Sequence, residues 1–340
     1  MMKALLITEP GKTVFGGCEE LGYGHNEVLV EVKMVGFCGT DLKTFRGENA
    51  MVTFPRVPGH EIAGIIREVG QAVPGKWTAG MPVTVSPYTS CGTCASCRRS
   101  RPNACEYNQT LGVQRDGAMT QFIRVPWQKL HGSANLSFHE LALVEPLSVG
   151  FHSVTRGEVE PGETVVVFGC GAIGLAAIAT ANWRGARVIA VGRSDEKLDL
   201  ARKIGASDTI NSRTHDLHST LQNMTEGGPD VIIEAVGAHE TLVSAVEEAS
   251  FAGRVVIIGY GQGTVPYDTN SIVKRELSIR GSRNAPDGAF SGAIAMLEQG
   301  HFPAGELVTR TVYFNEAGRA LEAWSDNTAG TIRIHVTMEG

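Results

Sequence analysis

The sequence lacks the features that are typical of proteins that bind nucleic acids or are inserted into membranes. Acidic residues outnumber basic ones across its 340 positions, the formal net charge is −6, and no block of lysine and arginine stands out. A basic footprint for nucleic acid is therefore missing. The apolar run that follows Met1 ends almost at once at Glu9, Pro10 and Gly11, too early for a signal peptide. We expect a cytoplasmic protein that binds neither nucleic acid nor a membrane.

One stretch is long and uncharged enough to be considered as a membrane span. Residues 164–183 carry no charge, and roughly 20 apolar residues cross a bilayer as a helix. The run contains three glycines directly after a β-branched segment, and no positive cluster or aromatic belt flanks it. This pattern favours a strand, a tight turn and the start of a helix over a membrane span.

The chain is long enough for two domains, and its first part is rich in strands. Hydrophobic residues make up 42% of the chain and charged residues 19%, as in ordinary globular proteins. Glycine and proline break the first part often, and no long helix is evident before about residue 139. No repeat or low-complexity segment is evident. The strands expected in this part are 28–35, 62–69 and 81–85.

After about residue 165, strand-like and helix-like segments alternate. This alternation predicts an α/β fold with a parallel, doubly wound sheet and right-handed crossovers. A later helix over 289–299 and a last strand over 331–337 are expected to rejoin the first domain. The expected strands of the sheet are 165–168, 188–191, 231–234, 255–259 and 277–281, and the expected helices are 173–184, 195–204 and 240–251.

Four of the seven cysteines are clustered within residues 91–105. In a cytosolic chain such clustering argues for a bound metal rather than for disulfides. Four thiolates close a tetrahedral shell around Zn²⁺ and leave no position open for chemistry. We therefore predict a structural zinc site, and a redox or sensing cluster is the weaker alternative. The predicted ligands are Cys91, Cys94, Cys97 and Cys105.

Residues 169–174 have the pattern Gly-x-Gly-x-x-Gly between a predicted strand and a predicted helix. The glycines let the backbone turn sharply and approach a pyrophosphate, whose charge lies at the helix N-terminus. In this context the motif predicts a dinucleotide site, and a glycine-rich packing turn is the weaker alternative. The residues expected to bind the dinucleotide are Gly169, Gly171, Ala172, Ile173 and Gly174.

The end of the next predicted strand distinguishes the two nicotinamide cofactors. A site for NAD carries an acidic residue there, about 20 residues after the glycines, for the ribose 2′-hydroxyl. This chain instead has Gly192, Arg193 and Ser194. Gly192 leaves room, Arg193 can pair with a 2′-phosphate, and Ser194 can add a hydrogen bond. We predict NADP in preference to NAD; the alternative is a solvated arginine with Asp195 capping the next helix.

A second set of candidate metal ligands is spread along the chain. Cys38 stands in a Cys-Gly-Thr-Asp segment after a strand, and His60 and Glu61 stand in Gly-His-Glu. Glu145 stands before a proline, close to the dinucleotide domain. All of these residue types ligate zinc. Taken singly, each is more often a buried cysteine, a satisfied histidine or a surface glutamate.

Together these five motifs, in this order and spacing, resemble the zinc-dependent medium-chain dehydrogenases over essentially the whole chain. The chain is most similar to the branch of sorbitol, threonine and L-galactonate dehydrogenases, because Glu145 stands where liver-type alcohol dehydrogenases carry a cysteine. The resemblance implies a β-rich GroES-like catalytic domain over 1–147 and 282–340 and a Rossmann domain over 148–281. It also implies a homodimer or homotetramer.

By this resemblance, Cys38, His60 and Glu61 hold the catalytic zinc, and Glu145 is a fourth, exchangeable ligand. The ion acts as a Lewis acid toward a bound alcohol, so the chain mainly positions the substrate and the nicotinamide. Three anionic ligands exceed the two charges of the ion by one, which weakens a Lewis acid. Release of Glu145 when the substrate binds would relieve this excess, so we treat Glu145 as a candidate switch.

The resemblance also implies roles for residues around the metal. Asp41 orients the imidazole of His60. Thr40 transfers the substrate proton away from the metal, and Arg283 contacts the nicotinamide and the substrate. The chain departs from its branch at Lys43, where relatives carry a histidine that ends the proton relay. A lysine can continue the relay or attract an acidic substrate. The alternative is a solvent-facing lysine, with the relay passing through water.

The expected substrate is a small sugar-like molecule. Gln114, Arg115 and Asp116 lie on a loop that borders the substrate cleft in relatives, and with Lys43 and Arg283 they can seat a carboxylate. We therefore expect a secondary alcohol of a polyol, a sugar or a sugar acid, with an aldonate favoured. The alternatives are a threonine or amino-alcohol dehydrogenase, a zinc-independent quinone or enoyl reductase, and a non-catalytic zinc-binding relative. Both metal motifs are present, which argues against the zinc-independent reductase, and Cys38, His60 and Thr40 are intact, which argues against the non-catalytic relative.

Overall fold

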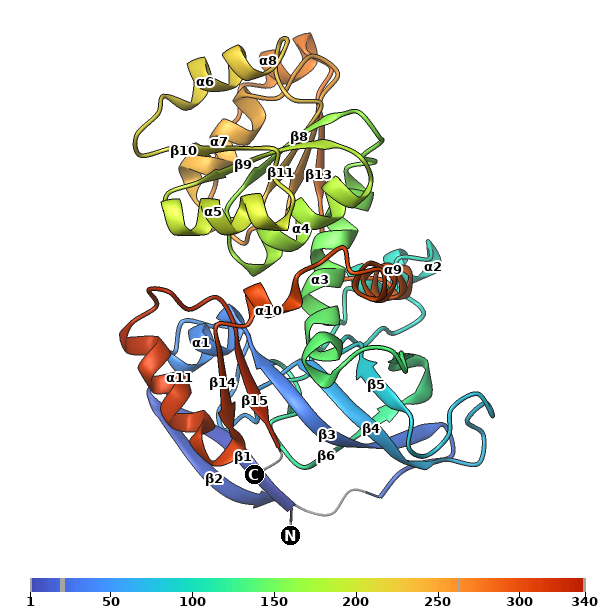
Figure 1. The fold of residues 1–340 in the computed structure, drawn as a ribbon. Helices are drawn as coiled ribbons and strands as arrows, with labels where there is room; N and C mark the ends of the chain where they lie inside the picture. Colours follow the sequence, from blue (N-terminus) through green and yellow to red (C-terminus); the bar gives the residue numbers. More distant parts are fainter. Residues whose placement is uncertain (1, 19–21, 262, 339–340) are drawn as a thin grey trace. The chain divides into compact units, whose positions relative to one another are not determined.

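In a computed structural model, which describes residues 2–18, 22–261 and 263–338, the chain divides into two compact units (Figure 1). The resemblance to the dehydrogenase family implied domain boundaries at 147/148 and 281/282. Helix α3 (Phe138–Arg156) crosses the first observed boundary between Glu145 and Pro146. The first unit is Met1–Glu145, Pro286–Glu298 and Ala304–Gly340, and the second unit is Pro146–Ala285 and Gln299–Pro303.

The first unit is built on a mixed sheet around strand β3 (Glu27–Phe37), which pairs antiparallel with three other strands. Residues along β3 alternate between buried and half-buried, as expected for a strand with one face on the core. The other strands of this sheet are β4 (Glu61–Val69), β5 (Pro82–Val85), β6 (Phe122–Pro126), β7 (Leu130–Gly132), β14 (Arg310–Tyr313) and β15 (Ile334–Thr337). Strands β1 (Met2–Glu9) and β2 (Lys12–Cys18) pair with each other in a separate two-stranded sheet.

The C-terminal part of the chain completes this sheet. Strand β15 pairs with β3 at the register Ile334 to Phe37, so the last described strand lies beside one of the first. The core of the unit joins both parts through fully buried side chains such as Phe37, Ile62 and Val336. Its helices are α1 (Gly39–Phe45), α2 (Ala95–Arg98), α9 (Asp287–Glu298), α10 (Ala304–Leu307) and α11 (Ala317–Asp326).

The second unit is a parallel sheet in the order β10-β9-β8-β11-β12-β13, with helices on both of its faces (Figure 1). The order reverses between β8 and β11, as in dinucleotide-binding folds. The strands are β8 (Thr164–Phe168), β9 (Arg187–Gly192), β10 (Asp208–Asn211), β11 (Val231–Glu234), β12 (Arg254–Ile257) and β13 (Ser278–Gly281). The helices are α4 (Ala172–Trp183), α5 (Asp195–Ile204), α6 (Leu217–Met224), α7 (His239–Glu247) and α8 (Thr269–Lys274).

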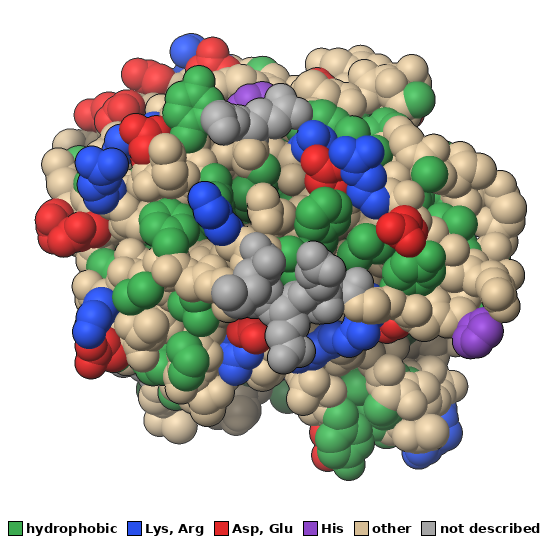
Figure 2. Space-filling model, turned by 90° about the horizontal axis from the view of Figure 1, so that it is seen from below, with side chains coloured by type: hydrophobic (Ala, Val, Ile, Leu, Met, Phe, Trp, Pro, Cys, Tyr) green, Lys and Arg blue, Asp and Glu red, His purple; other side chains and the backbone are tan. Residues whose placement is uncertain are grey.

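The uncharged stretch 164–183 forms β8 and α4 of this unit. Within the described part of the chain, we find no helix with the length and apolar character needed to cross a membrane. On the face shown in Figure 2, basic and acidic side chains of the described residues are interspersed, and neither sign dominates a broad area. This surface offers no extended basic track for a polyanion.

Candidate active site

Cys38, His60 and Glu61 lie together because two paired strands end and begin beside each other. In the antiparallel pair of β3 and β4, Gly36 lies opposite Glu61, which places Cys38, just after β3, next to His60, just before β4. The ligating atoms of the three side chains all lie within 4.8 Å of one another. A thiol, an imidazole and a carboxylate at this spacing are a donor set that zinc binds.

The hydrogen bonds of Glu61 leave one of its oxygens available. The residue is completely buried, and its Oε1 accepts a hydrogen bond from the guanidinium of Arg333. Its Oε2 is buried without a hydrogen-bond partner among the described residues. A buried carboxylate oxygen is costly to leave unpaired, and a cation beside Cys38 and His60 would satisfy it. The residues present therefore fit a zinc ion.

Asp41 holds the two ligand-bearing segments together through the backbone. Its carboxylate accepts hydrogen bonds from the backbone N–H of Cys38 at 2.9 Å and from that of Gly59 at 3.1 Å. The distance from Asp41 Oδ1 to His60 Nδ1 is 3.9 Å, which is too long for a hydrogen bond. Asp41 thus fixes the positions of both segments, and it contacts the imidazole more loosely than the resemblance implied.

Arg333 is a part of this cluster that the sequence analysis did not identify. It directly precedes β15, and its side chain is only 2% exposed. Its guanidinium forms a buried ion pair with Glu61. Burial raises the pKa of the Cys38 thiol, but the nearby His60 and Arg333 outweigh burial and lower that pKa to about 7. The cluster therefore favours the thiolate, the form of cysteine that binds metals.

Glu145 is not among the three residues whose ligating atoms lie within 4.8 Å of one another, but it interacts electrostatically with His60 and Glu61 and bonds Tyr88. The Tyr88 hydroxyl donates a hydrogen bond to Glu145 Oε1, and both side chains are buried. Burial and the carboxylate of Glu145 raise the pKa of Tyr88 well above its usual value, so the phenol stays protonated and remains the donor. The ring of Tyr88 makes an edge contact with Phe290 at a centroid distance of 6.4 Å. Tyr88 is the second site residue that the sequence analysis missed.

The four clustered cysteines form a second group in the first unit. The Cys91 and Cys97 sulfurs are 4.0 Å apart, and those of Cys94 and Cys105 are 3.8 Å apart. A disulfide requires about 2.05 Å, whereas a zinc tetrahedron with Zn–S bonds of about 2.3 Å separates its sulfurs by about 3.8 Å. All four ligating sulfurs lie within 4.8 Å of one another. This spacing fits one tetrahedral ion and excludes paired disulfides.

The glycine motif joins β8 to α4 in the second unit. A Cβ on Gly174 would lie 1.8 Å from the carbonyl oxygen of Gly169, so only glycine allows this helix to pack so closely. Nothing lies within 4 Å of the position that a Cβ on Gly171 would occupy, so a ligand can approach the backbone there. Gly171 is the N-cap of α4 and makes no side-chain cap hydrogen bond. The first N–H groups of the helix are therefore available to an anion.

Comparisons with known proteins agree with both units. A family model described as "Alcohol dehydrogenase GroES-like domain" matches residues 24–134, and one described as "Zinc-binding dehydrogenase" matches residues 172–299. L-galactonate-5-dehydrogenase from Escherichia coli K12 is 30% identical to this chain over 99% of both sequences. The chain belongs to the zinc-dependent medium-chain dehydrogenase family. It is a zinc-type alcohol dehydrogenase, an oxidoreductase that acts on small molecules.

Two solved structures of similar proteins contain nicotinamide cofactors. A protein from Sinorhizobium meliloti 1021 assigned as a zinc-binding dehydrogenase is bound to NADP and superposes with a TM-score of 0.91. An alcohol dehydrogenase from Escherichia coli CFT073 is complexed with NADH and superposes with a TM-score of 0.93. Each is 30% identical to this chain, and each match covers 99% of both chains. The predicted Rossmann and GroES-like fold class is confirmed.

In this dehydrogenase Gly192 is the last residue of β9, and Arg193 and Ser194 follow it. A Cβ on Gly192 would lie 3.1 Å from Leu198 Cδ2 and 3.2 Å from Cys170 Sγ, so the position is closely packed as well as small. Ser194 is the N-cap of α5, the helix that Asp195 begins. The carboxylate of Asp195 accepts a hydrogen bond from Asn211 at 2.7 Å. The acidic residue closest in sequence to Arg193 is thus already hydrogen-bonded. The N-cap position of α5 is taken by Ser194 and not by Asp195, which the alternative interpretation had placed there.

The other predicted catalytic residues lie in different places. Thr40 Oγ1 is 3.8 Å from the sulfur of Cys38. Lys43 lies one turn further along α1 and is exposed. Arg283 lies after β13 in the second unit and is also exposed. The structure therefore places Thr40 beside Cys38 and leaves Lys43 facing solvent.

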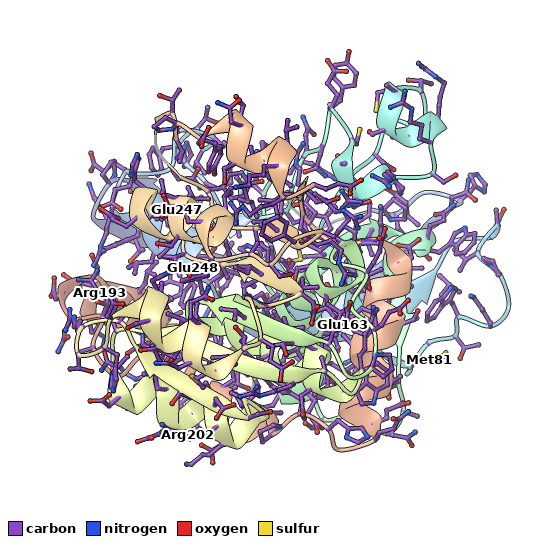
Figure 3. All side chains as sticks on the ribbon, turned by 90° about the horizontal axis from the view of Figure 1, so that it is seen from above. Met81, Glu163, Arg193, Arg202, Glu247 and Glu248 are labelled. Carbon is purple, nitrogen blue, oxygen red and sulfur yellow. The ribbon has the colours of Figure 1, made fainter. Side chains whose placement is uncertain are left out.

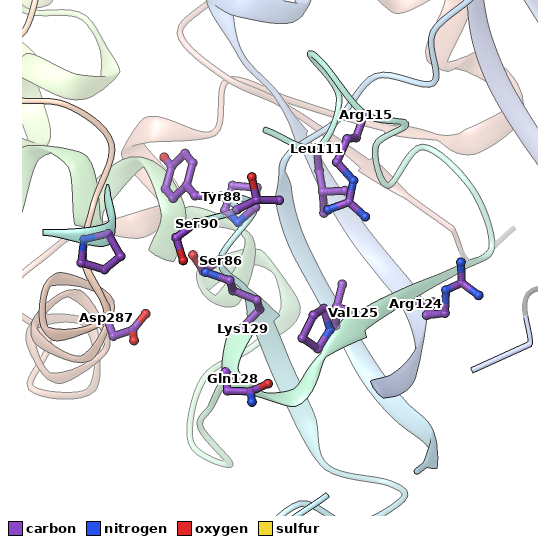
Figure 4. Close-up of a pocket in the computed structure, with 14 residues that line it drawn as sticks. Ser86, Tyr88, Ser90, Leu111, Arg115, Arg124, Val125, Gln128, Lys129 and Asp287 are labelled. Carbon is purple, nitrogen blue, oxygen red and sulfur yellow. The ribbon is translucent and has the colours of Figure 1, made fainter. Parts of the chain in front are cut away.

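The three residues of the predicted substrate loop differ in their contacts. Asp116 forms an ion pair with Arg56 at 2.9 Å and accepts the backbone N–H of Val57 at 3.1 Å. Gln114 accepts the backbone N–H of Thr110 at 2.9 Å. Asp116 and Gln114 therefore hold the loop in place. Arg115 is exposed and lines a pocket (Figure 4).

Proposed function

We propose that this dehydrogenase interconverts a secondary alcohol of a polyol, sugar or sugar acid with its ketone, with an aldonate favoured. The catalytic zinc would be held by Cys38, His60 and Glu61, with Glu145 as an exchangeable fourth ligand. The observation that carries the proposal is the convergence of three ligating atoms within 4.8 Å beside an unpartnered carboxylate oxygen. We further propose a second, structural zinc on the cysteine cluster.

When bound, zinc lowers the pKa of the alcohol oxygen and the nicotinamide accepts the hydride. The residues of the chain supply proton transfer and charge balance. The Thr40 hydroxyl, beside the sulfur of Cys38, accepts the proton of the substrate hydroxyl and passes it outward. Lys43 lies on the same face of α1, three residues on, where it meets solvent. We propose that water beside Lys43 completes the relay.

Arg333 changes the charge count of the site. Cys38, Glu61 and Glu145 contribute three negative charges, while zinc contributes two positive charges and the buried Arg333 contributes one. The total is zero, whereas the ligands alone exceed the ion by one. Arg333 therefore offsets the excess charge of the three ligands over the ion, and the buried carboxylate of Asp41 is a further negative charge beside the cluster.

The test of this function is a substrate screen with both cofactors. Neutral polyols, aldonates and amino alcohols are offered with NADP and with NAD, and the reduced nicotinamide is followed by its absorbance. We expect turnover of secondary alcohols, with aldonates best. Turnover of neutral polyols alone would contradict the proposal that an aldonate is the favoured substrate. Turnover confined to threonine or amino alcohols would instead favour the threonine and amino-alcohol dehydrogenases of the family.

Tyr88 has a role in keeping Glu145 exchangeable. Its hydroxyl bonds a carboxylate that would otherwise be free to approach the metal. Tyr88→Phe removes this donor, so we expect Glu145 to coordinate more firmly and kcat/KM to fall at least about tenfold, as for loss of about 1.5 kcal/mol, the lower end for a hydrogen bond to a charged group.

The informative readout for Tyr88→Phe is the visible spectrum of the cobalt-substituted enzyme, because it reports the number and geometry of metal ligands. The matched control is Tyr107→Phe, which alters an exposed tyrosine in the same unit. We expect a changed spectrum for Tyr88→Phe alone. An unchanged spectrum with an unchanged kcat/KM would show that Tyr88 does not govern Glu145.

We propose NADP as the preferred cofactor on the basis of Arg193. Its side chain is exposed (Figure 3), and it forms no hydrogen bond or ion pair with any residue in the described ranges. Asp195, the acid closest in sequence, is bonded to Asn211. A free guanidinium beside a small residue at the end of β9 suits a 2′-phosphate.

Arg193→Ala is expected to weaken NADP and spare NAD. Loss of a charge-assisted contact of about 1.5–3 kcal/mol corresponds to an increase of about 10- to 150-fold in the KM for NADP. Arg202→Ala is the matched control, because Arg202 lies in the same unit and is paired with Asp199. Gly192→Asp is the converse variant and should shift preference toward NAD, although its Cβ is crowded by Leu198. If the ratio of turnover with NADP to turnover with NAD stayed constant across these variants, Arg193 would not bind the 2′-phosphate of NADP.

A further inference from the structure

A pocket in the first unit is lined by more positive charge than negative charge. Its volume is about 440 Å³, within the range of about 300–1,000 Å³ typical of small-molecule sites. Three basic residues line it against a single acidic residue, Asp287, whose side chain is 71% exposed. The hydroxyl and amide groups of the lining come from Ser86, Tyr88, Thr89, Ser90 and Gln128.

The three basic residues differ in what they already contact. Arg124 donates a hydrogen bond to the carbonyl of Gly22 at 3.0 Å, lies 3.6 Å from Glu27, and points away from the other lining groups (Figure 4). Arg115 and Lys129 make no side-chain hydrogen bond to any residue within 2–18, 22–261 or 263–338. Figure 4 shows Lys129 beside Ser86 in the middle of the lining and Arg115 toward one side.

Of these two residues, Lys129 gives the stronger evidence for an anionic ligand, because it is half-buried. A lysine ammonium seldom loses part of its hydration without a partner. Burial lowers the pKa of Lys129, and its attraction to Asp287 and, more weakly, to Cys97 only partly compensates, since neither residue forms a hydrogen bond with the ammonium. An anion in the pocket would supply the missing partner, and Arg115 would add a guanidinium suited to planar or tetrahedral oxyanions.

We propose that this pocket binds a small hydroxylated molecule through a carboxylate or phosphate group, held by Lys129 and Arg115. The hydroxyls of Ser86 and Ser90 and the amide of Gln128 would bond the rest of the molecule. Tyr88 forms part of the wall and also bonds Glu145, so an occupant would lie against the residue that positions the proposed fourth ligand. The occupant is either the anionic end of the substrate or a separate oxyanion.

Titration calorimetry with inorganic phosphate tests this site without requiring catalysis. We expect saturable binding to the zinc-loaded enzyme, weakened at least about tenfold by Lys129→Gln and by Arg115→Gln, and reduced by added salt. Arg124→Gln removes the same charge from a residue that already has partners, and we expect it to change the affinity less than about twofold. Arg115 is exposed, so its variant keeps the test valid even if Lys129→Gln folds poorly.

Steady-state kinetics then separate the two sources of the anion. If phosphate raises the KM for the alcohol and leaves kcat unchanged, the pocket receives the anionic end of the substrate. If phosphate binds without changing that KM, a separate oxyanion is the occupant. Absence of saturable binding, or equal affinity in the wild type and Arg115→Gln, overturns the proposal and leaves the proposed dehydrogenase activity untouched.

Discussion

Cys38→Ser is expected to abolish turnover while the protein stays folded. The thiolate of Cys38 is one of three converging ligands, and a serine hydroxyl does not replace it as a zinc ligand. Loss of the Lewis acid removes several kcal/mol of stabilisation of developing charge. We therefore expect kcat/KM to fall by at least about a thousandfold. Activity, zinc content and the thermal midpoint should be measured on the same preparation.

The expected pattern for Cys38→Ser is specific. Zinc content falls by one ion per chain, while the thermal midpoint changes little, because Cys38 is only half-buried and the core of the unit does not depend on it. Cys170→Ser is the control for zinc content, since Cys170 is a buried thiol of the second unit that belongs to neither ligand group. A Cys38→Ser enzyme that keeps all of its zinc would contradict the ligand assignment.

Cys97→Ser is expected to lower the stability of the segment that carries the four cysteines rather than to act directly on hydride transfer. The segment around the four cysteines contains only short helical turns, α2 and Pro102–Ala104, and α2 buries none of its side chains. Such a segment has little apolar core, so the metal supplies most of its folding free energy, which for isolated zinc-binding peptides is about 10–16 kcal/mol. We expect the segment to unfold locally when one ligand is lost.

Limited proteolysis with trypsin measures this local unfolding. Arg98 and Arg99 lie within the segment and are exposed, yet cleavage requires the backbone around them to open. We expect cleavage at these arginines in Cys97→Ser to be at least about tenfold faster than in the wild type, and no faster in Cys38→Ser. Equal sensitivity of both variants would mean that the two metal groups do not divide into a structural and a catalytic role.

Local motifs made much of this molecule predictable. The glycine motif and the four-cysteine segment each lie within a few turns of chain, so their spacing alone carries the geometry. Strand β11 and helix α5 begin and end where the residue pattern placed them. Helix α3 was not expected, because residues 141–148 are buried on every side and show no helical periodicity, and Pro146 interrupts the pattern.

Contacts between distant segments were the part that the sequence did not reveal. Arg333 reaches Glu61 only because β15 pairs with β3, a register that no local pattern specifies. The only signal was that Arg333 and His335 alternate with apolar residues in the strand pattern at 332–336. Tyr88 had no signal of its own, since its partner Glu145 lies on another element. Both residues alter the chemistry that the ligand list alone implied.

The dependence of turnover on the metal of the Cys38 cluster tests the central claim most directly. The enzyme is treated with a chelator until one zinc per chain is lost, assayed with a secondary alcohol and NADP, and then titrated with Zn²⁺. We predict that activity disappears with this ion and returns in proportion to the zinc restored, in the wild type but not in Cys38→Ser. Full turnover by the enzyme lacking this ion would contradict the account.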